Sequence, residues 1–156
     1  MSEMKPYVTV KDIRIQSMSA VSTPPIDEDT DRNQTEFHVR HQFELRTVLP
    51  GPDNPLDENE MAALLSVVIN TPVGEITAAV EGSYLIESDK EDLLTEDNFI
   101  EFLNDEALVE LVAYLRATVS DLAMRVFRAT LNMPPFSHLN LHFEHKEESE
   151  ESAEGI

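Results

Sequence analysis

One stretch, residues 104–132, constrains the fold of this chain more than any other. Its apolar residues recur at steps of three and four, which is the spacing of one face of an α-helix. They are Leu108, Leu111, Val112, Leu115, Val119, Leu122, Val126 and Ala129. Asn104 is a candidate N-cap, and Pro134-Pro135 prevents continuation beyond Asn132. At about 1.5 Å per residue the helix is about 40 Å long, so the rest of the chain must supply a broad apolar surface for it to cover.

The residues that precede this helix contain strand patterns. In residues 36–49 apolar and polar side chains alternate strictly, which predicts a strand with one buried and one wet face, as in antiparallel sheets. Residues 7–18 also alternate, and their apolar parity changes between Val10 and Ile13. That change predicts a β-bulge near Lys11-Asp12. Residues 17–35 carry prolines and charges without periodicity and are predicted to be a loop.

Two further strands are predicted in the middle of the chain. Residues 61–70 are apolar almost throughout, and helix propensity at their start competes with the β-branched residues that follow. A strand from about Ala63 is favoured. Residues 75–87 form the next strand, in which Gly82 marks a close approach or a bulge. The residues that share its apolar face are Ile76, Ala78, Val80, Tyr84 and Ile86.

Strands followed by helices predict an α+β domain with two layers. Thr95 is a candidate cap for a short helix over residues 96–103, just before the long one, and residues 136–143 are predicted to be extended. We expect a four-stranded antiparallel meander sheet with both helices packed on one of its faces. The domain covers residues 1–143, of which the first six are expected to be frayed. The glutamate-rich residues 144–156 are predicted to be a disordered tail.

The formal net charge of -20 narrows the possible partners. Nucleic-acid binding needs a basic surface, and anionic membranes repel an acidic protein, so neither partner is expected. The chain has no cysteine, no apolar run of membrane-spanning length and no signal-peptide pattern at its start, so the cytoplasm is the expected compartment. A strong charge also keeps a protein with exposed apolar surface soluble.

No pattern in the sequence predicts catalysis, a metal or a cofactor. The four glycines are scattered, so there is no phosphate-binding loop. In an extended segment His138 and His142 would lie about 13 Å apart, too far to chelate one zinc ion. His41 lies on the apolar face of its strand, and we expect a core or groove histidine with a hydrogen-bond partner. The acidic loop over residues 26–34 lacks the glycine and the closing glutamate of a calcium loop.

Four short motifs are informative when they are taken in their order along the chain. Residues 11–16 read KDIRIQ, and residues 79–84 read AVEGSY. Residues 111–119 read LVAYLRATV, and Pro134-Pro135 precede the run LNLHF. Between about residues 7 and 143 these motifs resemble the first strand, the fourth strand, the main helix and the post-helix segment of the SecB family of export chaperones.

The resemblance implies a homotetramer, a dimer of dimers, that binds non-native polypeptides without ATP. Clients would lie in apolar grooves between the sheet edge, the connector before the long helix and the helix. The residues of this chain at those positions are Tyr84, Ile86, Leu93, Leu94, Phe99 and Phe102. The alternative is that each of them is an ordinary core residue.

The length of the main helix suggests where chains could meet. A helix of this length is longer than the strands of such a sheet, so part of its apolar side should overhang. We expect Leu111, Leu115 and Leu122 against the sheet. Ala123 and Phe127 are candidates for a subunit interface.

Docking of the translocase motor SecA, which binds the acidic sheet surface of the SecB family, is a further implication of the resemblance. Asp12 fits that surface. Gln16 and Thr77 stand where the family usually has glutamates, and Ala113 replaces a proline of the helix motif. The sequence therefore leaves SecA docking open.

Three functions are consistent with the sequence. The first is a SecB-like chaperone, linked or not to protein export. The second is a dedicated adaptor that binds one protein, such as a toxin–antitoxin component, through the same surface. The third is a carrier or an enzyme for a small apolar ligand. An open groove favours the first two, and a closed cavity with convergent polar groups favours the third.

Overall fold

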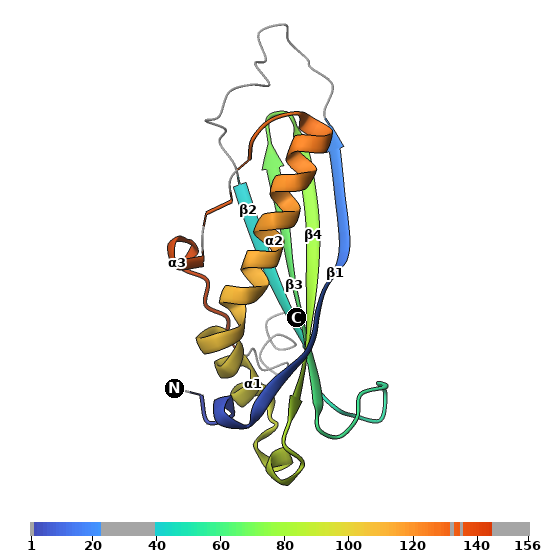
Figure 1. Cartoon of the computed structure of the whole chain (residues 1–156), viewed down its shortest axis with the longest axis vertical. Helices are drawn as coiled ribbons and strands as arrows, with labels where there is room; N and C mark the ends of the chain where they lie inside the picture. Colours follow the sequence, from blue (N-terminus) through green and yellow to red (C-terminus); the bar gives the residue numbers. More distant parts are fainter. Residues whose placement is uncertain (1, 23–39, 132, 135, 145–156) are drawn as a thin grey trace, which may run out of the picture.

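The computed structural model describes residues 2–22, 40–131, 133–134 and 136–144. It has two layers, an antiparallel sheet and a long helix that crosses one face of that sheet (Figure 1). The predicted α+β class is therefore confirmed. The strands are β1 (Val8–Ser22), β2 (Arg40–Val48), β3 (Glu60–Thr71) and β4 (Gly74–Ile86).

The strand order corrects the predicted meander. β2, β3 and β4 are neighbours in sequence and in space, as a meander requires. β1 instead pairs with β4, so the order is β1-β4-β3-β2, and β1 and β2 form the two edges. The prediction assumed that consecutive strands pair, which is a tendency and not a rule. Placement beside β4 puts the apolar side chains Ile13 and Ile15 against the main core.

Strand β1 contains two register shifts. The first lies between Val10 and Asp12, where the bulge was predicted. The second lies between Ile15 and Ser17 and was missed. Each shift switches the side chains to the other face, so the alternation becomes unreadable after residue 16. For this reason the strand continues to Ser22, and the prediction of a loop from residue 17 is wrong for residues 17–22.

The helical layer is one continuous helix where two were predicted. It consists of α1 (Glu96–Phe102), a π-helical turn (Leu103–Ala107), α2 (Leu108–Leu122) and a second π-helical turn (Ala123–Phe127). Thr95 caps its start as predicted, because its hydroxyl accepts a hydrogen bond from the Asn98 amide at 3.2 Å. The predicted cap at Asn104 is wrong, since helical backbone runs through that residue.

The helix also ends earlier than predicted. Arg128 takes the left-handed conformation directly after Phe127, and Asn132, the predicted end, lies outside the described residues. The π-helical turn has more residues per turn than an α-helix, so an apolar step of four stays on the buried face there. Ala123 and Phe127 are consequently buried, whereas the predicted face residue Val126 is 36% exposed.

The apolar side chains form two core clusters. The main cluster lies between the sheet and α2 and includes the predicted helix residues Leu108, Leu111, Val112, Leu115 and Val119. A second cluster, which we call the aromatic end, lies at the α1 end of the sheet. It consists of Met4, Met61, Ala63, Tyr84, Ile86, Phe99, Phe102, Leu103 and Ala107.

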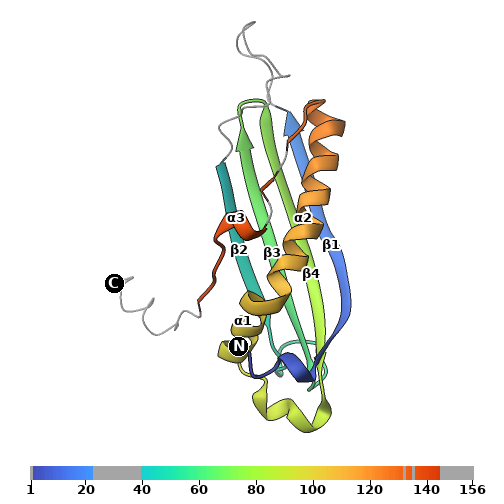
Figure 2. The same ribbon diagram turned by 60° about the vertical axis from the view of Figure 1, so that its left-hand side comes forward.

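The chain after the helix covers the β2 side of the same sheet face. Figure 2 shows the short helix α3 (Phe136–Leu139) beside α2, in front of β2 and β3. Residues 136–139 were predicted to be extended, and the structure corrects this. Phe136, Leu139, Leu141 and Phe143 pack against the main cluster.

Apart from Glu144, the predicted acidic tail lies outside the described residues. No helix of the described part is long and apolar enough to cross a membrane.

Candidate functional site

The six side chains predicted to line a peptide groove meet at the aromatic end. Tyr84 and Ile86 come from β4, and Phe99 and Phe102 come from α1; these four are at most 7% exposed. Leu93 and Leu94 come from the connector between β4 and α1 and are partly buried against the same cluster. The six residues do lie together, but in this structure they form a closed core instead of an open groove, and their role in peptide binding stays a prediction.

Three aromatic rings form the centre of this cluster. The Tyr84 ring stands edge-on to Phe99 and Phe102, at centroid distances of 6.1 and 5.5 Å. Gly82 makes room for it, because a Cβ at that position would lie 2.5 Å from the Tyr84 hydroxyl. The close approach predicted at Gly82 is confirmed. The hydroxyl is buried without a hydrogen-bond partner among the described residues, and burial raises its pKa, helped by the charge of Glu110.

Residues near the start of the chain close the aromatic end. Met4 is 0% exposed and belongs to the cluster, although the first six residues were expected to be frayed. Lys5 forms an ion pair with Glu106 of the first π-helical turn, with 2.8 Å between Nζ and Oε1. The Tyr7 carbonyl accepts a hydrogen bond from the Glu87 amide at 3.0 Å, and Lys90 lies over the Tyr7 ring. Met4 lies outside any periodic pattern, so this packing could not be predicted from the sequence.

A second candidate surface lies beside β2, where the chain after α3 contacts the first π-helical turn. The Asn104 side chain makes two hydrogen bonds to the main chain of Phe143. Its Nδ2 donates to the carbonyl oxygen at 2.8 Å, and its Oδ1 accepts from the amide at 3.0 Å. Asn104 was singled out from the sequence as a helix cap, and its actual role is this clasp.

Two open hollows flank the clasped segment. One, of about 360 Å³, is lined mainly by β2 and α1 together with Phe143: its residues are Phe43, Glu44, Leu45, Thr47, Glu96, Ile100, Phe143 and Glu144. The other, of about 320 Å³, lies on the far side of Phe143 between the helix and His142. Ile100 and Phe143 line both hollows, together with several carboxylates.

His41 lies on the same face of β2. Its ring stacks on Phe43 with 6.3 Å between the centroids, and burial lowers the pKa of the imidazole. The prediction of a core or groove position therefore fits its partial burial. The predicted hydrogen-bond partner is missing for Nε2, which is buried and unpaired among the described residues.

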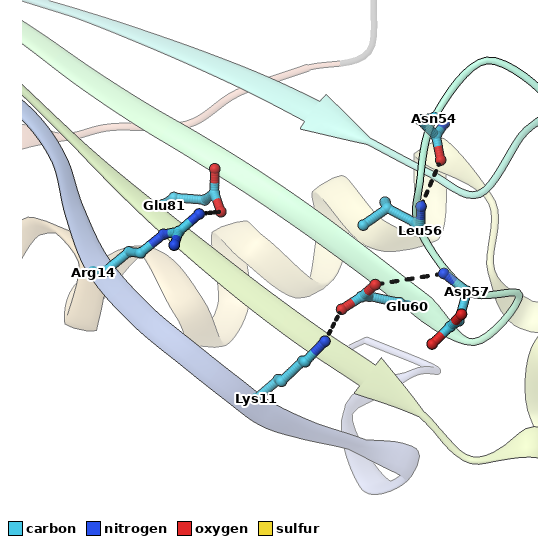
Figure 3. Close-up of polar contacts among 7 residues, drawn as sticks. All are labelled: Lys11, Arg14, Asn54, Leu56, Asp57, Glu60 and Glu81. Carbon is cyan, nitrogen blue, oxygen red and sulfur yellow. Dashed lines mark hydrogen bonds and ion pairs between the residues drawn. The ribbon is translucent and has the colours of Figure 1, made fainter.

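The outer face of the sheet carries the predicted motor-docking residue, Asp12. Asp12 is exposed on β1, opposite Ser83 of β4. Figure 3 shows that neighbouring carboxylates are already paired within the chain. Lys11 forms an ion pair with Glu60 and lowers the pKa of that carboxyl. Arg14 forms a second ion pair, with 3.2 Å between its Nη2 and Oε1 of Glu81. These pairs reduce the net negative charge that the face would present to a basic partner, and the docking role of Asp12 stays a prediction.

The two predicted interface residues face inward. Ala123 and Phe127 are 0% and 3% exposed, and Phe127 packs against Gly74. Their role between subunits stays a prediction, with little surface available in a single chain. The helix instead exposes Val109, Tyr114, Met124 and Val126, and β1 exposes Val10, Met18 and Val21.

Comparison with solved structures finds a protein of similar fold. The Mycobacterium tuberculosis SecB-like chaperone Rv1957, solved in complex with a ChAD peptide from the HigA1 antitoxin Rv1956, superposes with a TM-score of 0.67. Its sequence is 14% identical, and the match covers 86% of this chain and 94% of that chain. A protein of unknown function from Streptococcus agalactiae gives a TM-score of 0.40 at 14% identity, over 81% of this chain and 96% of that chain.

The two comparisons based on sequence find no match. The sequence matches no protein-family model, and a search of curated proteins finds no similar sequence. The 0.67 match nevertheless agrees with the motifs that resemble the SecB family. This chain has a divergent SecB-like fold.

Proposed function

We propose that this protein is an ATP-independent chaperone or adaptor that binds polypeptides in an extended conformation. The observation that carries the proposal is the clasp between Asn104 and Phe143. One side-chain amide satisfies both the carbonyl and the amide of a single residue, as a neighbouring β-strand would. Such contacts bind the main chain whatever its side chains are, which is the chemistry of a low-specificity peptide site.

The hollows beside the clasp support the same conclusion. Phe143 of the chain itself already lines both of them, so the site holds an aromatic side chain. Both hollows are open at the surface, which favours an extended ligand over an enclosed small molecule. The net charge of -20 favours clients that combine apolar and basic residues. No step of this function needs catalysis.

A dedicated adaptor is the second candidate. The M. tuberculosis protein of similar fold was solved with a peptide from one antitoxin, and this favours a single cognate partner as an alternative to many clients. The two functions would use the same surface and differ in selectivity. A chaperone would bind many unrelated unfolded chains with similar affinity, and an adaptor would bind one of them far more tightly.

We also propose a homo-oligomer, a dimer of dimers as in the SecB family. Two features support it: β1 is a long edge strand, and both β1 and the helix expose apolar side chains. Unpaired strand edges and exposed apolar patches are surfaces that a second chain can cover. The native mass in solution tests this point. A tetramer agrees with the proposal, and a monomer at micromolar concentration would contradict it.

Peptide binding can be located with a fluorophore, because the chain has no cysteine and one introduced thiol is unique. Thr47→Cys places the label in the larger hollow. Ser66→Cys serves as the control. It places the label on β3, where residue 66 pairs with Glu44 of β2 and with Ala79 of β4. A permanently unfolded client should change the emission of the first label saturably and leave that of the second unchanged.

The same titration separates the alternatives. Similar affinities for several unrelated unfolded clients support the chaperone. Saturation by one client only, with the others inactive at tenfold higher concentration, supports the adaptor. If no unfolded client changes either signal while a small apolar dye does, the carrier for small ligands is the better account.

A further inference from the structure

The aromatic end is closed by a segment that belongs to the same chain. We call residues 2–6 the N-terminal cover. Its Met4 side chain is 0% exposed and lies in the cluster that contains Tyr84, Phe99 and Phe102. An unbranched apolar side chain thus fills a seat whose walls include Tyr84, Phe99 and Phe102, to which the resemblance to the SecB family gives a role in client binding.

Ser2 and Met4 of the cover are buried, and the polar contacts of the cover among the described residues are few. Its described main-chain hydrogen bonds are local: the Met4 amide donates to the Ser2 hydroxyl, the Tyr7 amide to the Met4 carbonyl and the Val8 amide to the Lys5 carbonyl. Beyond the Met4 side chain, its described link to the helix is the ion pair of Lys5 with Glu106. The two side chains of that pair are 49% and 38% exposed, so solvent and salt screen it.

The walls of the seat are held far more firmly than the cover. Met61 and Tyr84 are opposite each other on the central strands β3 and β4, and Phe99 and Phe102 lie on a capped helix. These elements keep their own hydrogen bonds when the cover leaves. Glu106, the anchor of Lys5, lies in the first π-helical turn, and single π-helical turns within α-helices occur frequently at functional sites.

We propose that the N-terminal cover is a displaceable occupant of a client site, and that Met4 takes the place of a methionine or leucine side chain of the client. This inference rests on the proposed binding of extended polypeptides and adds its regulation. A client binds at the aromatic end as the cover leaves, so the apparent affinity equals the intrinsic affinity multiplied by the fraction of open molecules. Closure by Met4 keeps the aromatic surface hidden until a client competes for it.

The ion pair allows the cover to be loosened without any change in the seat. Lys5→Glu places a like charge against Glu106 and should raise the open fraction. We expect about fivefold tighter binding of a fluorescent unfolded polypeptide rich in leucine and methionine, measured by anisotropy on the full chain. The double variant Lys5→Glu with Glu106→Lys restores the attraction with the charges exchanged, and its affinity should return to that of the wild type.

A second measurement follows Met4 itself. With methionine methyl groups labelled with carbon-13, the Met4 resonance should move from a ring-shifted position to the solvent-exposed position when the client is added. The same movement should be partial in free Lys5→Glu. Met61, which forms part of the seat, should shift on client binding but stay buried.

The outcomes separate this inference from the proposed function. If wild type and Lys5→Glu bind the client with equal affinity and the Met4 resonance stays fixed, the cover is structural, and the proposed function stands. Binding by Lys5→Glu alone means that the cover closes the site completely, which supports the inference. If wild type, Lys5→Glu and the double variant all fail to bind any unfolded client, the proposed function itself is overturned.

Discussion

The main core and the aromatic end are built from the same kinds of residue but are closed in different ways. The main core is covered by α2, whose buried side chains belong to a continuous helix anchored along its length. The aromatic end is covered on one side by five residues that contribute one methionine and one half-exposed ion pair. Closure by a long element produces a permanent core. A short, weakly held segment can open locally, and another chain can then bind the surface beneath it.

The largest expected effect concerns Gly74, where β4 begins under the end of the helix. Its φ of +153° is rarely adopted by other residues, and a Cβ there would clash with the Val21 carbonyl and lie 2.6 Å from the Phe127 ring. Gly74→Ala should lower the free energy of unfolding by about 3 kcal/mol or more, measured by urea denaturation. Gly51→Ala is the control, since its nearest neighbour would be 3.5 Å away, and it should change stability by less than about 0.5 kcal/mol.

The second prediction compares truncations in the two regions. Leu115→Ala in the main core should cost about 2–5 kcal/mol of unfolding free energy and should not improve client binding. Met4→Ala should cost less, about 1–2 kcal/mol, because the cover can rearrange or leave, and it should tighten client binding. Urea denaturation and anisotropy on the same samples check both statements. Equal stability losses with no gain in affinity for Met4→Ala would remove the distinction between the two regions.

The third prediction concerns the dependence of stability on pH. Burial lowers the pKa of His41 in the folded protein, so the unfolded chain takes up a proton more readily. The contribution of His41 to stability is therefore intact above its ordinary pKa of about 6.5 and is lost as the pH falls below that value. His41→Phe should therefore lose less stability than wild type between pH 8 and pH 5.5, measured by urea denaturation. Parallel pH profiles for wild type and His41→Phe would refute this.

The smallest effect is expected at the centre of the aromatic end. The Tyr84 hydroxyl is buried without a partner among the described residues, so its removal in Tyr84→Phe relieves a desolvation cost and breaks no hydrogen bond described in this structure. The free energy of unfolding should stay within about 0.5 kcal/mol of wild type or rise slightly. A loss of more than about 1.5 kcal/mol would show that the hydroxyl has a partner, such as an ordered water molecule.

Much of the fold could be predicted because periodicity is a local property. The helix face from Leu108 to Val119, the bulge near Lys11 and the cap at Thr95 are each readable within a few residues. The pairing of β1 with β4 could not be predicted, because it joins segments more than 50 residues apart. The fusion of two helices was missed because Asp105 and Glu106 resemble the acidic first turn of a new helix.

The candidate site was predictable only in part, for a similar reason. The resemblance to the SecB family identified Tyr84, Phe99 and Phe102, which do lie together. The other contacts around it come from single residues whose partners are remote in sequence. Met4 reaches its seat from the start of the chain, and Asn104 binds the main chain 39 residues further on. Contacts of this kind have no pattern along the sequence and become visible only in the folded protein.

The central claim is that this chain binds extended polypeptide through apolar surface at its helix–sheet edge. Calorimetric titration of a permanently unfolded client into the full chain at several temperatures tests it most directly. The account predicts saturable binding with a negative heat-capacity change, because apolar surface is buried. The same client in its folded form, and an inert protein of equal negative charge, should give no such signal. A heat of binding that is absent, or that vanishes with salt and shows no heat-capacity change, would contradict the account.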